Sequence, residues 1–129
     1  MEKRLKLKIS SCKYSIIQLA KDSKIPEWIN INDNLFSITR TSEELSIVYK
    51  SSSIPKNKNI EQNRNWIIIK IEEILDLSLV GILYSISKVL KQYNIPMFTI
   101  STYNTDYILI KKNDKRKAIK CLSKYYDII

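Results

Sequence analysis

The chain has 129 residues, 44% of them hydrophobic, so it can bury one compact core or two small cores packed closely together. It has no histidine, and its two cysteines, Cys12 and Cys121, lack metal-ligand spacing. These features exclude the usual zinc sites and histidine-dependent catalysis, and they predict no metal and no cofactor. Because no segment resembles a signal peptide or a membrane span, we expect a cytoplasmic protein that does not enter a membrane.

The formal net charge of +9 raises the question of a polyanionic partner. Clustered Lys and Arg side chains attract nucleic acids and anionic membranes, but here the excess is mostly lysine and is scattered along the chain. The chain is also crowded with Ile and Asn and poor in Gly and Pro, the bias expected from an AT-rich genome. Composition drift therefore explains the charge as well as a nucleic-acid partner does.

The first half of the chain predicts short strands. Apolar residues alternate with lysines near the N-terminus, a period of two that indicates a strand with one exposed face. The expected strands are residues 5–9, 14–19, 35–40 and 46–50. Thr41 followed by Glu44 has the spacing of a capping box and predicts a short helix. Residues 51–65 carry almost no apolar side chains and mark the expected internal boundary.

The second half shows clearer patterns. Residues 66–71 form a nearly unbroken apolar run, typical of a buried strand. Apolar residues then recur every three or four positions through residues 79–93, which predicts an amphipathic helix. The remaining expected elements are strands at residues 97–102 and 106–111 and a last helix that Asn113 caps and whose residues 118, 119, 122 and 125 face inward.

The order strand, helix, strand, strand, helix is most of a ferredoxin-like βαββαβ unit, in which two helices cover one face of an antiparallel sheet. The first half reads as a degenerate version of the same plan. The sequence therefore predicts an α+β protein with two tandem ferredoxin-like units, at residues 1–60 and 61–129, packed as one compact body. The pattern leaves open whether the units share one sheet or pack side by side.

Four separated motifs carry a family resemblance: IPEWI, FSITRTSEELSIV, NWIIIKIEEILDLSLVGIL and FTISTYNTDYILIKKND. In this order they resemble the small bacterial ACT-domain proteins with two tandem ACT-like units, over about residues 7–122, and more remotely the ACT pairs of eukaryotic arginine sensors. The resemblance implies an amino-acid-binding regulatory module, usually dimeric, without catalysis of its own. An open antiparallel sheet also leaves edge strands that a homodimer would protect.

Gly81, the only glycine, lies near the predicted start of the 79–93 helix, where it costs about 1 kcal/mol relative to alanine. Close approach of a ligand would justify that cost, since the unpaired N–H groups of a helix N-terminus can hold a carboxylate. The alternative is that Gly81 only lets a helix and a strand pack closely. In the resembling family the preceding residue is often threonine, where this chain has Val80.

Asp106 is the second candidate, because a carboxylate at the start of a strand could pair with the ammonium group of a ligand. As a turn residue it needs no ligand, and the turn interpretation is slightly favoured because Asn and Asp side chains bond the local backbone. Neighbouring hydroxyl side chains complete the predicted site. The candidate ligand-binding residues are Val80, Gly81, Ile82, Ser101, Thr102, Tyr103, Asn104, Thr105 and Asp106.

Two other function classes are weaker. A nucleic-acid-binding ferredoxin-like domain is the alternative because of the +9 charge, but RNA-recognition motifs need a glycine-and-aromatic signature that a chain with one glycine lacks. An enzyme is not expected, since no nucleophile and base pair can be assembled and no catalytic residue is assigned. Arg40, at a strand end, is a further position that could attract a carboxylate or be salt-bridged.

Overall fold

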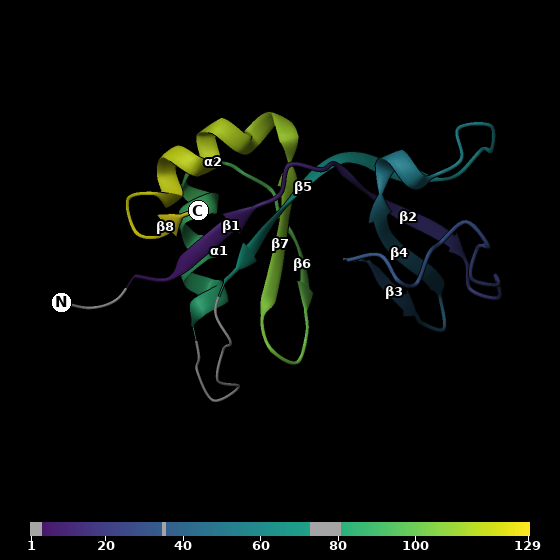
Figure 1. Ribbon diagram of the computed structural model, residues 1–129. Coiled ribbons are helices and arrows are strands. Elements are labelled where there is room, and N and C mark those ends of the chain that lie inside the picture. Colours follow the sequence, from purple (N-terminus) through teal and green to yellow (C-terminus); the bar gives the residue numbers. More distant parts are fainter. Residues whose placement is uncertain (1–3, 35, 73–80) are drawn as a thin grey trace. The chain divides into compact units, whose positions relative to one another are not determined.

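The computed structural model describes residues 4–34, 36–72 and 81–129 of the chain (Figure 1). Its contacts divide the chain into two compact units, which we call the N-terminal unit (Cys12–Asn65) and the C-terminal unit (Met1–Ser11 with Trp66–Ile129). The sequence predicted a division between residues 60 and 61. The observed division differs from it chiefly at the N-terminus, because the first strand pairs with strands of the C-terminal unit.

The N-terminal unit is built around a central strand that is buried along most of its length. Its elements are β2 (Tyr14–Ala20), β3 (Ser37–Arg40), β4 (Glu44–Lys50), the 3-10 turn η1 (Ser51–Ser53) and the first residues of β5 (Gln62–Ile71). β4 lies between β2 and β3 and pairs antiparallel with both. The core side chains are Ile17, Ile29, Leu45, Ile47, Tyr49 and Ile54. The strands predicted here are confirmed within a few residues at each end.

The short helix predicted after Thr41 is wrong. The Thr41 hydroxyl accepts hydrogen bonds from the main-chain N–H groups of Glu43 and Glu44, both at 3.1 Å, as a capping residue would. The main-chain N–H of Thr41 in turn donates to the carbonyl of Glu44 at 2.9 Å, and this bond closes a hairpin turn between β3 and β4. A threonine can bond the local backbone in either a cap or a turn, so the motif alone did not separate them.

The C-terminal unit has the predicted ferredoxin-like order with one added strand. Its elements are β1 (Lys6–Ile9), β5, α1 (Ile82–Gln92), β6 (Phe98–Ser101), β7 (Asp106–Lys111), the 3-10 turn η2 (Lys112–Asp114), α2 (Lys115–Leu122) and β8 (Asp127–Ile128). The strands lie in the order β6-β7-β5-β1-β8. β1 therefore sits between β5 and β8, where a simple βαββαβ unit would pair its first and last strands directly.

The sheet of the C-terminal unit is mixed, which corrects the prediction of purely antiparallel sheets. β1 runs antiparallel to β5, with Leu7 opposite Ile71, and parallel to β8, with Leu7 opposite Ile128. The β1 and β8 strands are held by main-chain bonds such as Ile129 N–H to the Leu7 carbonyl at 2.8 Å. β8 was not predicted, because a two-residue strand leaves no periodic pattern to read.

The core of the C-terminal unit lies between one face of this sheet and the two helices. Successive side chains of a strand point to opposite faces, so Ile67, Ile69 and Ile71 of β5 share the face that packs against both helices. The helices contribute Ile86, Val89 and Leu90 from α1 and Ala118, Cys121 and Leu122 from α2. Full burial of one such aliphatic side chain contributes about 1.5–3 kcal/mol. This arrangement confirms the predicted α+β fold with helices on one face.

The two helices start later than the sequence suggested. Gly81 is the N-cap residue of α1 and adopts φ +88°, so it precedes the helix and does not lie within its first turn. Asp114 occupies the N-cap position of α2 and makes no side-chain cap bond, so the predicted cap at Asn113 is wrong. The turn η2 accounts for this shift, because it takes up the residues that would have formed the cap.

Candidate functional site

A pocket of about 360 Å³ lies in the C-terminal unit, where the end of β5 meets the turn between β6 and β7. It is lined by Lys70, Ile71, Glu72, Thr102, Asn104, Thr105 and Tyr107. Thr102, Asn104 and Thr105 belong to the predicted site. The volume falls within the range of about 300–1,000 Å³ that is usual for small-molecule sites.

The turn that forms one wall of this pocket is held by its own threonines. The main-chain N–H of Thr102 donates to the carbonyl of Thr105 at 2.9 Å, and the Thr102 hydroxyl donates to the same oxygen at 3.1 Å. Thr105 is almost fully buried, and its hydroxyl donates to the carbonyl of Ile71 at 2.9 Å. The turn is thus attached to β5 through a bond that needs no ligand.

The end of β5 brings one cation and one carboxylate to the same pocket. Lys70 and Glu72 are alternate residues at the end of β5, with Lys70 Nζ 3.2 Å from Glu72 Oε2. Within the described part of the chain, Oε2 is shielded from solvent and has this ion contact but no hydrogen bond. Both side chains keep about a third of their surface exposed, at 39% and 33%. The pocket therefore presents both signs of charge within reach of water.

The remaining predicted site residues do not line this pocket. The Ser101 hydroxyl donates to Asp106 Oδ1 at 2.5 Å across the β6–β7 pair, so the Asp106 carboxylate already has a partner in its own hairpin. Tyr103 is 85% exposed at the tip of the turn. Ile82 packs against the helix-side core. Val80 lies outside the described residues.

Gly81 has a conformational reason for being glycine. Its φ of +88° lies in the left-handed region that other residues rarely adopt. No described heavy atom would come within 4 Å of a Cβ built at this position. Close approach of another part of the described chain therefore does not explain the residue, whereas its backbone conformation does.

Lys70, Glu72 and Tyr107 are pocket residues that were missed. Lys70 interrupts the apolar run of residues 66–71, and Tyr107 stands opposite it in the β5–β7 register. A charged residue inside a buried apolar run was the available signal. This charged residue did not indicate a pocket, because a strand pattern alone does not show which turn lies beside the end of the strand.

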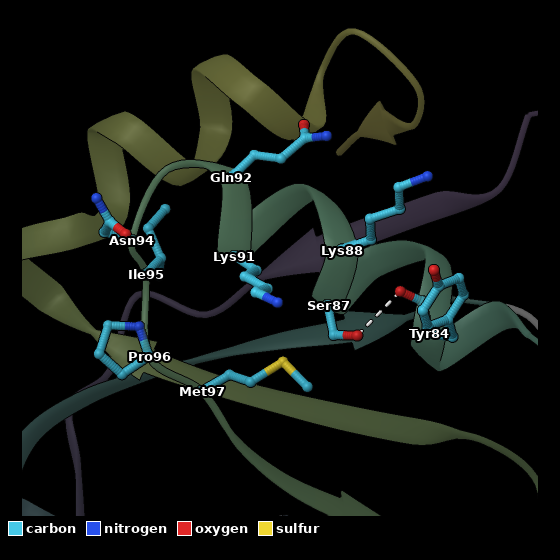
Figure 2. Close-up of a pocket in the computed structure, with 9 residues that line it drawn as sticks. All are labelled: Tyr84, Ser87, Lys88, Lys91, Gln92, Asn94, Ile95, Pro96 and Met97. Carbon is cyan, nitrogen blue, oxygen red and sulfur yellow. Dashed lines mark hydrogen bonds between the residues drawn. The ribbon is translucent and has the colours of Figure 1, made fainter.

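The larger hollow of the C-terminal unit is a groove of about 830 Å³ beside α1. Figure 2 shows Ser87 and Lys91 of α1 above Pro96 and Met97, which lead into β6. Tyr84 also lines it, is 67% exposed, and accepts a 2.9 Å hydrogen bond from the Ser87 hydroxyl through its carbonyl (Figure 2). None of the predicted ligand-binding residues lies along this groove.

Arg40 is held by backbone carbonyls. Its guanidinium donates to the carbonyl of Lys21 and, at 2.6 Å, to that of Ser23. These bonds fasten the residues after β2 to the end of β3, and they use the planar fork that a ligand carboxylate would need. The structural interpretation of Arg40 therefore accounts for its contacts.

The described residues form neither a membrane-spanning helix nor a cluster of metal ligands. None of the helices they form is long and apolar enough to cross a membrane. Among the same residues, no group of three or more His, Cys, Asp or Glu side chains is placed to hold a metal ion.

The fold and its pocket define an α+β domain of the ferredoxin-like class with a small-molecule-sized hollow at one end of its sheet. A family model described as an ACT domain matches residues 61–124. A second model, described as an N-terminal domain, matches residues 12–57. The chain belongs to the ACT-domain family. A search of curated proteins found no match.

Solved structures with the same fold include one close relative in sequence. The protein Atu0741 from Agobacterium tumefaciens is 30% identical, with a TM-score of 0.88 over 99% of this chain and 94% of that chain. The aspartate kinase of Clostridium acetobutylicum is 13% identical, with a TM-score of 0.64 over 92% of this chain and 34% of the kinase. A possible C-terminal regulatory domain of aspartate kinase from Porphyromonas gingivalis is 14% identical, with a TM-score of 0.54 over 92% of this chain and 96% of that one.

Proposed function

We propose that this chain is a non-catalytic regulatory module that binds a free amino acid, or a similar small zwitterion, in the pocket at the end of β5. The observation that carries this proposal is the Lys70–Glu72 pair, which sets an ammonium and a carboxylate 3.2 Å apart beside a hydroxyl-bearing turn. A free amino acid carries the same two charges on neighbouring carbons. Its carboxylate can pair with Lys70 and its ammonium with Glu72.

The Lys70 and Glu72 side chains are 39% and 33% exposed, so a ligand can reach this pair and exchange partners with it. Thr102 and Asn104 lie at the same pocket and offer polar groups to the ligand. The Thr105 hydroxyl is already committed to the Ile71 carbonyl, so we assign it to holding the turn in place.

The fold comparisons support a regulatory role of this kind. The chain resembles the aspartokinase structures in fold, and aspartokinase III of Escherichia coli, 13% identical with a TM-score of 0.60, was solved in complex with aspartate and ADP. The chain covers 32% of that enzyme's length. We propose that this chain binds its ligand in the bacterial cytoplasm and that ligand binding has a regulatory role.

A thermal-shift screen of the free amino acids at millimolar concentration tests the proposal. A ligand present at about 100 times its dissociation constant adds about 2.7 kcal/mol of stability, which is readily seen. The Glu72→Gln variant should lose the shift, because the ammonium of the ligand then has no counter-charge. Glu43→Gln removes an exposed carboxylate in the N-terminal unit and serves as the matched control.

Three outcomes of these measurements would support or contradict the proposed amino-acid site. A screen in which no amino acid raises the unfolding temperature contradicts the proposal in this form. Equal loss of the shift in Glu72→Gln and Glu43→Gln would assign the effect to overall charge. The Asp106→Ala variant should keep the shift, because the structure pairs Asp106 with Ser101 in the hairpin; loss of the shift there would move the site toward the tip of the turn.

We also propose that the chain forms a homodimer through the edge of the C-terminal sheet. β6 is the last strand in the order β6-β7-β5-β1-β8, and an edge strand presents unpaired main-chain groups that another chain can use. The groove along α1 opens beside the residues leading into β6 and carries exposed Tyr84 and half-buried Met97. A second copy paired along β6 would cover both the unpaired main-chain groups of this strand and the groove along α1.

Size-exclusion chromatography with light scattering measures this directly. The parent chain should run as a dimer, and Tyr84→Lys combined with Met97→Lys should give monomers, because two lysines would be buried against their symmetry mates. Tyr125→Lys changes another tyrosine of the same unit, 56% exposed, and should leave the dimer intact. A parent chain that stays monomeric at high micromolar concentration would refute the dimer without touching the ligand proposal.

A further inference from the structure

A second pocket, separate from the proposed amino-acid site, lies wholly within the N-terminal unit. Its volume is about 470 Å³, and its polar lining includes Lys13, Ser51, Ser52, Lys56, Gln62 and Arg64. The lining also includes an exposed cysteine, Cys12, and an asparagine, Asn65. The charged side chains that line it are all cationic, and no Asp or Glu is among them.

Three short segments of the chain build this pocket. The main-chain N–H of Ser51 donates to the carbonyl of Lys13 at 3.0 Å, which places the start of β2 beside the turn η1. The Ser51 hydroxyl forms a 2.8 Å hydrogen bond with the hydroxyl of the fully buried Ser15, and this bond fixes the position of the Ser51 side chain. The pocket wall contributed by η1 is thus held by bonds inside the unit.

The third wall comes from the start of β5. Gln62 and Arg64 are alternate residues of this strand and point to the same face, which is the face that lines the pocket. Asn65 has a left-handed backbone with φ 70°, which breaks the alternation and brings a second consecutive residue to the pocket. Its side-chain amide adds a further polar group to the lining.

The electrostatics of the pocket favour a bound anion. Lys13, Lys56 and Arg64 line one hollow, so the positive potential of their side chains favours an anion there. In the part of the chain that the structure describes, no carboxylate forms an ion pair with Lys13 or Lys56. Serine hydroxyls and side-chain amides supply uncharged donors to the same space.

The geometry points to a binding site for a small molecule that carries two or three linked phosphate groups. Phosphate oxygens accept several charge-assisted hydrogen bonds at once, which matches lysine and arginine side chains combined with hydroxyl donors. The lining contains no aromatic ring, so the pocket has no platform on which a nucleobase could stack. We therefore expect the pocket to recognise the phosphate groups of a ligand and not a nucleobase.

The same features argue against a nucleic-acid strand as the occupant. Proteins that bind single strands combine a basic groove with aromatic stacking, and the groove follows several nucleotides. This pocket is a hollow of about 470 Å³ within one unit, which is the size of a small-molecule site. A short polyphosphate fits that description, and its charge would be shared among three cations.

Isothermal titration of the full chain with sodium tripolyphosphate tests this inference. Binding should be measurable at low salt and should weaken as ionic strength rises from about 0.05 M to about 0.5 M, because partly exposed charges are screened. ATP and CTP should bind with similar affinity to each other, because the base makes no contact. A single-stranded oligonucleotide that bound far more tightly than tripolyphosphate would overturn the assignment.

Two variants and one control separate a built site from diffuse positive charge. Lys56→Gln and Arg64→Gln should each weaken tripolyphosphate binding about tenfold, the loss expected when one charge-assisted contact disappears. Lys58→Gln lies two residues from Lys56, is exposed, and does not line the pocket, so its affinity should stay at the parent value. Equal losses in all three variants would refute the site.

Separate controls check that the variants fold and that the phosphate site is independent of the proposed amino-acid site. Lys56 is exposed, so Lys56→Gln should not lower the unfolding temperature, and circular dichroism checks that both variants keep the fold. Glu72→Gln, made for the amino-acid site, should leave tripolyphosphate binding unchanged. Absence of tripolyphosphate binding to the parent chain would refute this inference and leave the amino-acid proposal standing.

Discussion

The hydroxyl of Thr105 donates a 2.9 Å hydrogen bond to the main-chain carbonyl of Ile71 and so fixes the β6–β7 turn against the end of β5. These two residues are 34 positions apart in the sequence, and both are buried. The bond holds the turn threonines near the Lys70–Glu72 pair, and both groups line one pocket. The pocket thus depends on a contact that carries no charge.

Replacing Thr105 with valine should destabilise the chain. Valine keeps the shape of threonine but leaves the buried Ile71 carbonyl without its side-chain donor, at a cost of about 1–3 kcal/mol. Urea unfolding followed by circular dichroism measures the change. Thr99→Val on the partly exposed edge strand β6 is the matched control and should stay within about 0.5 kcal/mol of the parent. Equal stability of Thr105→Val and the parent would contradict the structural role.

Tyr49→Phe should destabilise the N-terminal unit. The Tyr49 hydroxyl donates to Asp33 Oδ2 at 2.5 Å and accepts the main-chain N–H of Asn30 at 2.9 Å, so one atom ties β4 to the loop before β3. Loss of a hydrogen bond to a charged group costs about 1.5–3 kcal/mol. Tyr103→Phe, at the 85% exposed turn position, is the control expected to unfold like the parent in the same urea experiment.

Alkaline pH should lower the stability of the chain, in part through the same tyrosine. The hydrogen bond to the Asp33 carboxylate is the main cause that raises the pKa of Tyr49 above 10.0, and burial raises the pKa of Tyr14 in the same direction. A group whose pKa is raised by folding adds stability that is complete below its unfolded pKa and is lost as pH rises through its folded pKa. Stability should therefore fall above about pH 10, and less steeply in Tyr49→Phe.

The two cysteines should react at different rates with a thiol reagent. Cys12 is exposed, whereas Cys121 is 1% exposed in the helix-side core. Burial raises the pKa of the Cys121 thiol, which lowers the fraction of reactive thiolate at neutral pH. The native chain should bind one equivalent of reagent quickly and a second only in urea. Rapid labelling of Cys121 in a Cys12→Ser variant would contradict the packing of α2.

Gly81→Ala should cost more stability than Gly81→Asn. The φ of +88° strains any residue with a Cβ, but asparagine tolerates the left-handed region better than alanine does. We expect a loss of about 1 kcal/mol for alanine. Because no described atom crowds this position, both variants should still respond to the ligand found in the amino-acid screen. Selective loss of ligand response in both would return Gly81 to the binding site.

Local patterns predicted the second half of the chain well. The strand at residues 106–111 and the helix within residues 79–93 follow from period-two and three-to-four-residue spacing, which report burial directly. The capping-box spacing at Thr41 failed because its hydroxyl satisfies the same N–H groups in a hairpin turn. A short polar motif is compatible with several local structures, whereas a long stripe of apolar residues is compatible with few.

Only some of the predicted site residues line this pocket, for a related reason. Thr102, Asn104 and Thr105 line the pocket, and Asp106 turns instead to Ser101. Which way a side chain near a turn points depends on the neighbouring strand, and the sequence does not name that neighbour. Lys70 and Glu72 belong to the pocket because β5 ends beside this turn, a pairing of segments more than 30 positions apart.

The sequence by itself determined the α+β class, the order of the main elements and the membership in the ACT-domain family, because these follow from local periodicity and from motifs read along the chain. The glycine at position 81, which first suggested a ligand site, has a left-handed backbone conformation that favours glycine. Only the tertiary structure decided that β1 lies between β5 and β8, and that three separate segments gather cations around one hollow. Strand partners and pocket walls are long-range contacts, and their energies depend on neighbours that no local pattern specifies.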